Sequence, residues 1–210
     1  MDLFSILIFA AVAVFFAVKL YSVLGRHEGH MEPPSEAPSP TLDTSPKPAD
    51  PDPVLAQWDA SAISGLEDIA RHDMRFDPQS FVQGAKSAYA TIVEAFAKGD
   101  RQTLKTLLSD KVYTAYATAI EAREARGEDL LTVIEHIDKA HITAAEKSGN
   151  TARVTVEFAA QIGTETRNDQ GEAISGDLDR LSKVHEAWVF ERDLTSTDPN
   201  WVLTRVTSLA

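Results

Sequence analysis

The sequence contains no cysteine among its 210 residues. A disulfide bond, a thiolate nucleophile and a cysteine-ligated metal site are therefore excluded. Basic residues are scarce as well, because 20 Lys and Arg stand against 32 Asp and Glu, for a formal net charge of −12. No Lys/Arg-rich run occurs, which argues against a phosphate-neutralising nucleic-acid surface and against a polybasic contact with anionic lipid.

One long apolar run is present, at the N-terminus. Between Leu3 and Leu24 the only charged residue is Lys19, and a helix of this length, roughly 33 Å, would span a bilayer. Residues 1–25 are therefore predicted to form a single-pass transmembrane anchor. The alternative is a cleaved signal peptide, in which positive charge precedes the apolar run, whereas Lys19 and Arg26 follow it here. By the positive-inside rule, the remainder of the chain would face the cytoplasm.

Residues 26–57 are predicted to be an acidic, proline-rich, disordered linker. Eight of the ten prolines lie between Pro33 and Pro53, and such a segment buries too little apolar surface to fold. Proline favours an extended spacer, while a PxxP ligand, the alternative, lacks a supporting basic pattern. His27 and His30 could ligate a metal, but their spacing is not that of a helical zinc motif. The favoured interpretation is that this short stretch is polar because the chain leaves the membrane there.

Residues 58–75 are predicted to be an amphipathic helical segment. Ile63, Leu66 and Ile69 recur at helical spacing. This helix could dock on the domain, on a membrane or on a partner, and its acidic polar face disfavours anionic lipid.

Residues 76–210 are predicted to be the folded domain, which opens with a well-delimited helix. Asp77 is a natural N-cap, Pro78 suits the first turn, and Gly99 ends the helix. Its apolar face is broad enough to be buried. Two further helices are predicted, at residues 101–108 and from Ser109 or Asp110 to about residue 126.

After Gly127 the periodicity changes from that of a helix to that of strands. "ARVTVEFAAQI" alternates apolar and polar residues, as a half-buried antiparallel strand does. The strands are predicted at residues 133–147, 152–162, 184–192 and 201–206, with residues 167–179 as a polar loop. Helices followed by strands indicate an α+β fold, with helices packed on a four-stranded antiparallel sheet.

Several stretches resemble the Tim44-like family, which includes the bacterial TimA proteins. They are "FVQGAKSAYATIVEAFAKGDRQTLKTLLSDKVYTAYATAIEARE", "ARVTVEF", "WVFERD" and "DPNWVL", in the family's order, across residues 76–206. The resemblance implies a cone-shaped domain like the cystatin and nuclear-transport-factor-two folds, with a large apolar pocket between helices and sheet. It also implies an anchor in a bacterial inner membrane. In place of the long charged N-terminal region of the mitochondrial relative, this chain has the proline-rich linker.

These features predict a membrane-tethered adaptor whose cytoplasmic domain binds a protein partner, with a link to protein translocation or the assembly of membrane complexes. The alternative is a carrier or sensor of a lipid or another apolar ligand in the pocket, and ribosome anchoring is a weaker possibility that the acidic charge disfavours. For each aromatic candidate, burial in the core competes with a role in contact. The candidate pocket or partner contacts are Phe81, Tyr89, Ile92, Phe96, Tyr113, Tyr116, Val156, Phe158, Trp188, Phe190 and Trp201.

No enzymatic activity, cofactor or metal is expected. The best catalytic candidates are His136, Asp138 and His141, with His185 on another strand. In a regular strand His136 and Asp138 share one face and His141 points to the other, which separates the three unless a bulge intervenes. Exposure of His136 and Asp138 on the outer face of the sheet would count against catalysis.

Overall fold

The computed structural model describes residues 58–209. The predicted anchor and linker, residues 1–57, lie outside the described residues. Of the helices in the described part, none combines the length and the apolar character needed to cross a bilayer. The elements are the helices α2 (Ala60–His72), α3 (Pro78–Lys98), α4 (Arg101–Leu107) and α5 (Asp110–Glu124), and the strands β1 (Asp129–Ser148), β2 (Thr151–Arg167), β3 (Ala173–Asp193) and β4 (Val202–Ser208).

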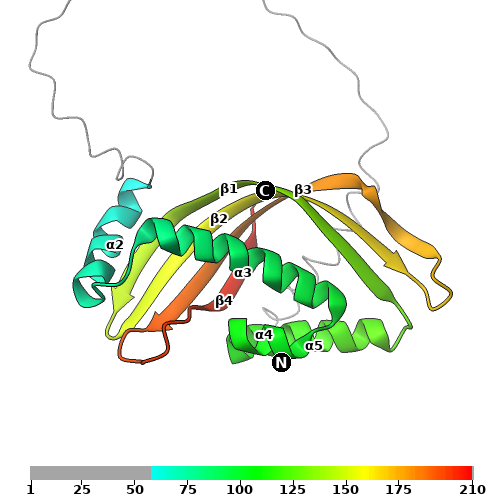
Figure 1. Ribbon diagram of the computed structural model, residues 1–210, viewed down its shortest axis with the longest axis horizontal. Coiled ribbons are helices and arrows are strands. Elements are labelled where there is room, and N and C mark those ends of the chain that lie inside the picture. Colours follow the sequence, from blue (N-terminus) through cyan, green and yellow to red (C-terminus); the bar gives the residue numbers. More distant parts are fainter. Residues whose placement is uncertain (1–57, 210) are drawn as a thin grey trace, which may run out of the picture. The chain divides into compact units, whose positions relative to one another are not determined.

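The four strands form one antiparallel sheet in the order β1-β2-β3-β4. The sheet is strongly curved, and α3 lies across its concave side with α4 and α5 beyond it (Figure 1). Each strand therefore presents one face to the helices and one to solvent, which explains the strict alternation of half-buried and buried residues from Thr151 to Ile162 of β2. The predicted α+β class and the four-stranded antiparallel sheet are confirmed.

The boundaries of α3 follow the predicted capping signals. The Asp77 carboxylate accepts a hydrogen bond from the Ser80 amide at 2.7 Å, and Pro78 occupies the first turn. At the other end Gly99 adopts a left-handed conformation with φ of 71°, which glycine reaches without a steric penalty. The local sequence thus fixes the length of this helix.

Arg123 joins α5 to the end of α3. Its guanidinium donates hydrogen bonds to the carbonyl oxygens of Phe96 and Ala97, at 3.1 and 2.9 Å, and lies 5.5 Å from the centroid of the Phe96 ring. These carbonyls belong to the last turn of α3, where a cation also complements the helix dipole. A buried arginine is therefore the main polar link between the two helices.

The prediction of a polar loop over residues 167–179 is wrong. β2 continues to Arg167, the chain turns through residues 168–172, and β3 begins at Ala173. The pairing jumps from Ile162 with Ser182 to Thr164 with Asp177, which leaves residues 178–181 opposite Gly163. Both sides of this hairpin extension meet solvent, so its residues show no apolar alternation from which a strand could be predicted.

Two glycines make this irregular crossing possible. A Cβ at Gly163 would lie 2.3 Å from the Leu178 carbonyl oxygen. Gly176 has φ of +78°, and a Cβ there would lie 2.2 Å from the Thr164 carbonyl oxygen. Close backbone approach at a sheet irregularity requires residues without a Cβ.

α2 packs along the edge of the sheet, beside the second half of β1. The Ser61 hydroxyl donates to the Thr143 carbonyl at 3.2 Å. Ala62, Leu66 and Ile69 are buried against the core, whereas Met74, just after the helix, is fully exposed. Among the destinations considered for this segment, the described structure places it on its own domain.

We expect Gly65→Ala to detach or displace α2. A Cβ at Gly65 would lie 1.8 Å from the Ala145 carbonyl oxygen, a backbone atom of β1, so the helix must move and the free energy of unfolding should fall by about 2 kcal/mol. The matched control is Gly84→Ala in α3, where a Cβ meets nothing within 4 Å and better helix propensity should add up to about 1 kcal/mol. Urea denaturation measures both changes, and equal effects of the two substitutions would contradict the expectation.

Candidate functional site

An aromatic cluster fills the middle of the concave side of the sheet. Tyr89 of α3 packs at 4.7 Å, between ring centroids, on both Phe158 and Trp188. Phe190 continues the cluster and meets Phe81 edge-on at 6.0 Å. Trp188 and Phe190 are each only 2% exposed. These rings occupy the space between α3 and the central strands in which the resemblance implies an apolar pocket.

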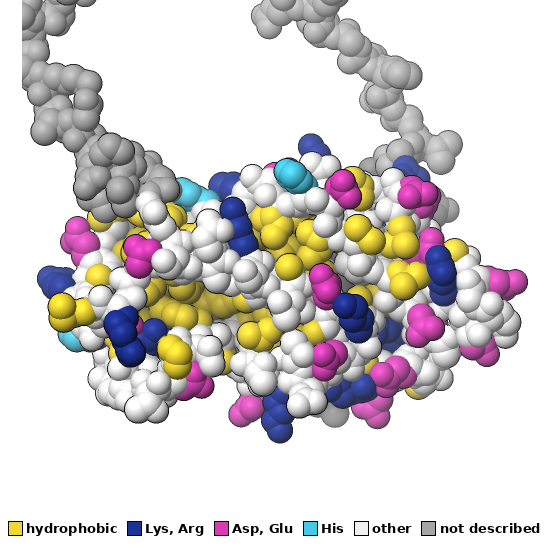
Figure 2. Space-filling view, in the orientation of Figure 1, with side chains coloured by type: hydrophobic (Ala, Val, Ile, Leu, Met, Phe, Trp, Pro, Cys, Tyr) yellow, Lys and Arg dark blue, Asp and Glu magenta, His cyan; other side chains and the backbone are white. Residues whose placement is uncertain are grey.

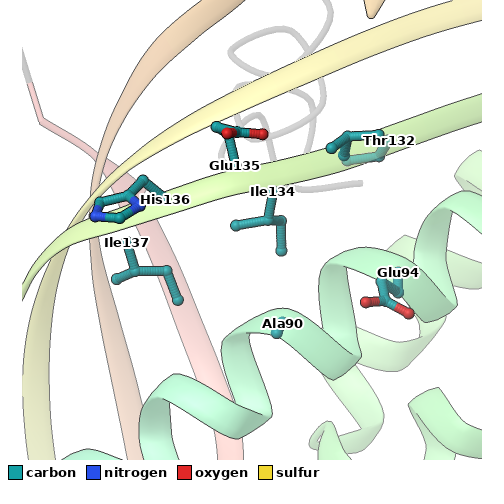
Figure 3. A pocket seen from close by; sticks show the side chains of 8 residues that line it. Ala90, Glu94, Thr132, Ile134, Glu135, His136 and Ile137 are labelled. Carbon is teal, nitrogen blue, oxygen red and sulfur yellow. The ribbon is translucent and has the colours of Figure 1, made fainter.

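An open cleft lies to one side of this cluster, between α3 and β1 (Figure 3). Its volume is about 570 Å³, and its lining is Ala90 and Glu94 from α3 together with the six consecutive residues from Thr132 to Ile137 of β1. Ile134 and Ile137 point from the strand toward α3, and Glu135 lies on the other side of the strand (Figure 3). The cleft thus has an apolar floor with a carboxylate on either side of the strand.

The cleft lies at an outer edge of the sheet, since among the strands of residues 58–209 β1 pairs only with β2. Hydrophobic side chains gather on this face of the molecule, interspersed with Asp, Glu, Lys and Arg (Figure 2). Val133, in the lining of the cleft, is 44% exposed. An outer strand presents backbone N–H and C=O groups that can pair with another chain.

Glu186 of β3 is a polar residue on the face of the sheet that the helices cover. Glu186 pairs across the sheet with Phe158, a residue of the buried face, and its carboxylate accepts a hydrogen bond from the Trp188 indole at 2.9 Å. Burial raises the pKa of this carboxyl. Burial also raises the pKa of Tyr89 and Tyr116, and the nearby charge of Glu186 adds to both shifts. The charge of Glu186 on β3 thus acts on phenols of both α3 and α5.

We expect Glu186→Gln to make the domain more stable at neutral pH. A carboxyl whose pKa is raised by folding stabilises the fold below its unfolded value of about 4.5, and this contribution is lost as the pH rises through the raised pKa. Glutamine keeps an acceptor for the Trp188 indole and carries no charge to bury. The free energy of unfolding, measured at pH 5 and pH 8, should fall with pH more in the wild type than in the variant. Glu135→Gln, at an exposed position, is the control and should leave the pH dependence unchanged.

β-Bulges change the geometry predicted for the histidines of β1. The ladder with β2 shifts at Glu135, Asp138 and Thr143. As a result His136 and His141 lie opposite Gln161 and Glu157, which both belong to the outer face. The separation expected for a regular strand does not hold, because the bulges that were named as its exception are present.

These candidate groups are nevertheless engaged separately. The Asp138 carboxylate accepts from the Gln161 amide at 3.1 and 3.2 Å, and a ring nitrogen of His141 lies 3.0 Å from the Asp59 carboxylate. His185 lies 2.7 Å from Glu157, which also pairs with a lysine. Within residues 58–209 no cluster of three or more metal-ligating side chains occurs. His27 and His30 lie outside the described residues.

The predicted contact residues divide into two groups. The core buries Phe81, Tyr89, Ile92, Val156, Phe158, Trp188 and Phe190. The other four, which are Phe96, Tyr113, Tyr116 and Trp201, pack against that core and are partly exposed. A contact role remains a prediction for all eleven, and only the second group has side-chain surface available for it.

The lining of the cleft was not among the predicted contacts. Glu94 lies on the polar side of its helix, and the residues from Thr132 to Ile134 precede or begin the strand that the alternation indicates. The sequence contains no signal that pairs Glu94 with Glu135, because their proximity depends on how α3 crosses the sheet. A carboxylate on the exposed side of a helix ordinarily indicates a solvated surface.

Comparison with known proteins establishes the family. A family model described as the Tim44-like domain matches residues 62–208, which is most of the chain. The chain belongs to the Tim44-like family. The resemblance of the sequence stretches is therefore confirmed, and the matched region begins within α2 and ends in β4.

The Tim44-like relatives include a human protein named mitochondrial import inner membrane translocase subunit TIM44. It is 25% identical over 135 residues, which cover 64% of this chain and 30% of the human protein. An uncharacterized protein of Rickettsia prowazekii is 21% identical over 150 residues, which cover 70% of this chain and 59% of that protein. The match spans less than a third of the human relative, so what the two chains share is the domain.

Solved structures give more distant likenesses to the Tim44-like domain. The intermembrane space region of the chloroplast protein ARC6 has a TM-score of 0.46 at 12% identity, over 65% of this chain and 98% of that chain. A putative dehydratase of the NTF2-like family from Streptomyces avermitilis has a TM-score of 0.40 at 19% identity, over 63% of this chain and 99% of that chain. Scores at this level support no statement about ligand or activity.

Proposed function

We propose that this Tim44-like protein is an adaptor tethered to a bacterial inner membrane, whose domain binds a protein partner in the cytoplasm. The observation that carries the proposal is the family match over residues 62–208, shared with a translocase subunit of an inner membrane. The apolar run at residues 1–25 supports the tether, and its flanking charges support the cytoplasmic orientation. The adaptor would act in protein translocation or in the assembly of membrane complexes.

Tethering suits a domain with a modest contact surface. The predicted tether would keep the domain near its membrane partners and raise the effective concentration, so a weak contact could still be occupied. The cleft of about 570 Å³ beside β1 and the four partly exposed aromatic residues are the surfaces available for such contacts.

Binding rather than catalysis is the role we propose for the domain. The candidate acid–base groups support this choice, because His141 and His185 face separate carboxylates and Asp138 faces an amide. The burial of Trp188 and Phe190 supports a protein partner over an apolar ligand held in the concave face.

Proximity labelling in living cells tests this function. A labelling enzyme fused after residue 210 should mark cytoplasmic and inner-membrane proteins, and the marked set should depend on the domain. The control carries the same enzyme directly after residues 1–57. Labelling of periplasmic proteins would refute the orientation, and identical sets from the two fusions would refute a partner-binding role for the domain.

A further inference from the structure

The two halves of the outer edge of β1 differ in what lies beside them. Beside the second half, α2 lies so close that Gly65 approaches the Ala145 carbonyl. The Ser61 hydroxyl also donates a hydrogen bond to the Thr143 carbonyl. Beside the first half lies the cleft, whose lining from Thr132 to Ile137 comes from the strand itself. The domain thus shields one half of its exposed edge with its own helix and leaves a cleft along the other half.

The open half offers two kinds of contact to an added strand. Alternate side chains of an extended peptide point to opposite faces of the sheet. On the α3 side they would meet the apolar floor formed by Ala90, Ile134 and Ile137, and on the other side they would pass Glu135 (Figure 3). The volume of the cleft, about 570 Å³, is enough for a few side chains, whereas a whole helix about 10 Å across would not fit.

The charge of the cleft selects the occupant. Its eight lining residues include two carboxylates, Glu94 and Glu135, and no lysine or arginine. The cation nearest to Glu94 in the chain is Lys98, which pairs with it at 3.1 Å and is 71% exposed, so an incoming cation can replace it. The protein's own linker is a poor occupant, because residues 26–57 are acidic and contain eight prolines, which lack the N–H that strand pairing needs.

We propose that the first half of the β1 edge binds an extended, basic segment of a partner protein by strand addition, with apolar side chains over Ile134 and Ile137 and cationic side chains beside Glu135, while Glu94 adds negative charge on the α3 side of the cleft. The inference rests on the proposed function, since it names the kind of partner that the adaptor binds. The bulge at Glu135 interrupts regular pairing and limits the added strand to a few residues. Binding is therefore weak and depends on the tether, and unlimited edge-to-edge association is prevented.

The test uses fluorescein-labelled decapeptides and the full chain in neutral detergent, with anisotropy as the readout. A peptide of alternating lysine and valine should bind saturably, and the same peptide with glutamate for lysine should not bind. Two further lysine–valine peptides carry N-methyl groups, one on all lysine amides and the other on all valine amides. One of these two should lose binding, because only one edge of the peptide pairs with β1. Equal binding of both methylated peptides, or binding of the acidic peptide, would overturn the proposal.

Charge-reversed variants locate the binding site. Glu94→Arg combined with Glu135→Arg should weaken binding about ten-fold, since each attraction becomes a repulsion at an exposed position. The matched control combines Glu67→Arg and Glu121→Arg, two exposed helical positions with the same change in charge. Equal losses from the two double variants would refute the cleft as the site, as would dimer formation through this edge in sedimentation experiments.

The same variants separate this inference from the function on which it rests. In the proximity-labelling experiment the pair Glu94→Arg and Glu135→Arg should remove partners that the control pair keeps. If the domain-dependent set persists unchanged in both double variants, the adaptor function stands and the strand-addition site is wrong. If no domain-dependent set exists even in the wild type, the proposed function itself fails.

Discussion

Replacing Asp73 with alanine is expected to lower the free energy of unfolding by about 3 kcal/mol. Asp73 follows α2 and forms an ion pair with Arg192 of β3, with side chains that are 8% and 10% exposed. Removal of the carboxylate leaves a buried guanidinium whose remaining neighbours include the Trp201 ring, at 5.5 Å from the centroid. The contact joins residues 119 positions apart, so its loss should also loosen α2.

Three further variants test the ion pair. Arg192→Met alone should cost a similar amount, and the double variant should cost much less than the sum, because removing both partners together leaves neither charge buried without the other. Asp68→Ala is the control, since its pair with Arg71 is exposed and should contribute under about 1 kcal/mol. Additive effects of Asp73 and Arg192 in urea denaturation would contradict the expectation.

The Asp73 pair also predicts an acid dependence. Burial alone would raise the pKa of Asp73, but the hydrogen bonds from Arg192 and from the Arg75 amide, with the charges of both arginines, lower it below 3.8. The stabilisation is therefore fully present above about pH 4 and is lost as the pH falls through the lowered pKa. The difference in stability between the wild type and Asp73→Ala should shrink accordingly below pH 4.

Replacing Trp188 with alanine is expected to cost about 4 kcal/mol. The side chain is 2% exposed and contacts three aromatic rings, those of Tyr89, Phe158 and Phe190, with centroids 4.7 to 6.2 Å away. Its removal leaves a large cavity in the layer that joins α3 to the sheet. The Glu186 carboxylate also loses the hydrogen bond that the Trp188 indole donates to it.

The stability of this variant should be measured by circular dichroism. Fluorescence is unsuitable because the protein has only three tryptophans, so the signal would change with the substitution itself. Trp188→Phe is the conservative control and should recover more than half of the loss, since most of the apolar volume returns. Near-native stability of the alanine variant would mean that the aromatic cluster is not what holds α3 on the sheet.

Strand addition to a half-covered edge would give the fold a defined place for a partner. The edge of β1 is shielded near Thr143 and Ala145, where α2 lies on it, and the cleft lies along the earlier residues from Thr132 to Ile137. Substitutions that displace α2, such as Gly65→Ala, would lengthen the exposed edge, which connects the stability of the docked helix to the specificity of the edge.

The sequence by itself determined the elements with strong local signals. Asp77, Pro78 and Gly99 define α3, and the alternation from Ala152 to Ile162 defines the central part of β2 and its buried face. These features depend on hydrogen bonds and side-chain periodicity within a few residues, which is why they can be predicted without the fold. The family resemblance was also present in the sequence, since it lies in the order of such local stretches.

Only the tertiary structure decided the bulges of β1, the extension of β3 and the cleft. The shift at Glu135 and the crossing at Gly163 arise from pairing between strands, and no residue-level pattern marks them in advance. The position of Glu94 beside Ile134 depends on the angle at which α3 crosses the sheet, and that angle is set by the packing of Tyr89 on Phe158 and Trp188. Local signals specify elements, whereas a surface between elements exists only once their side chains have packed.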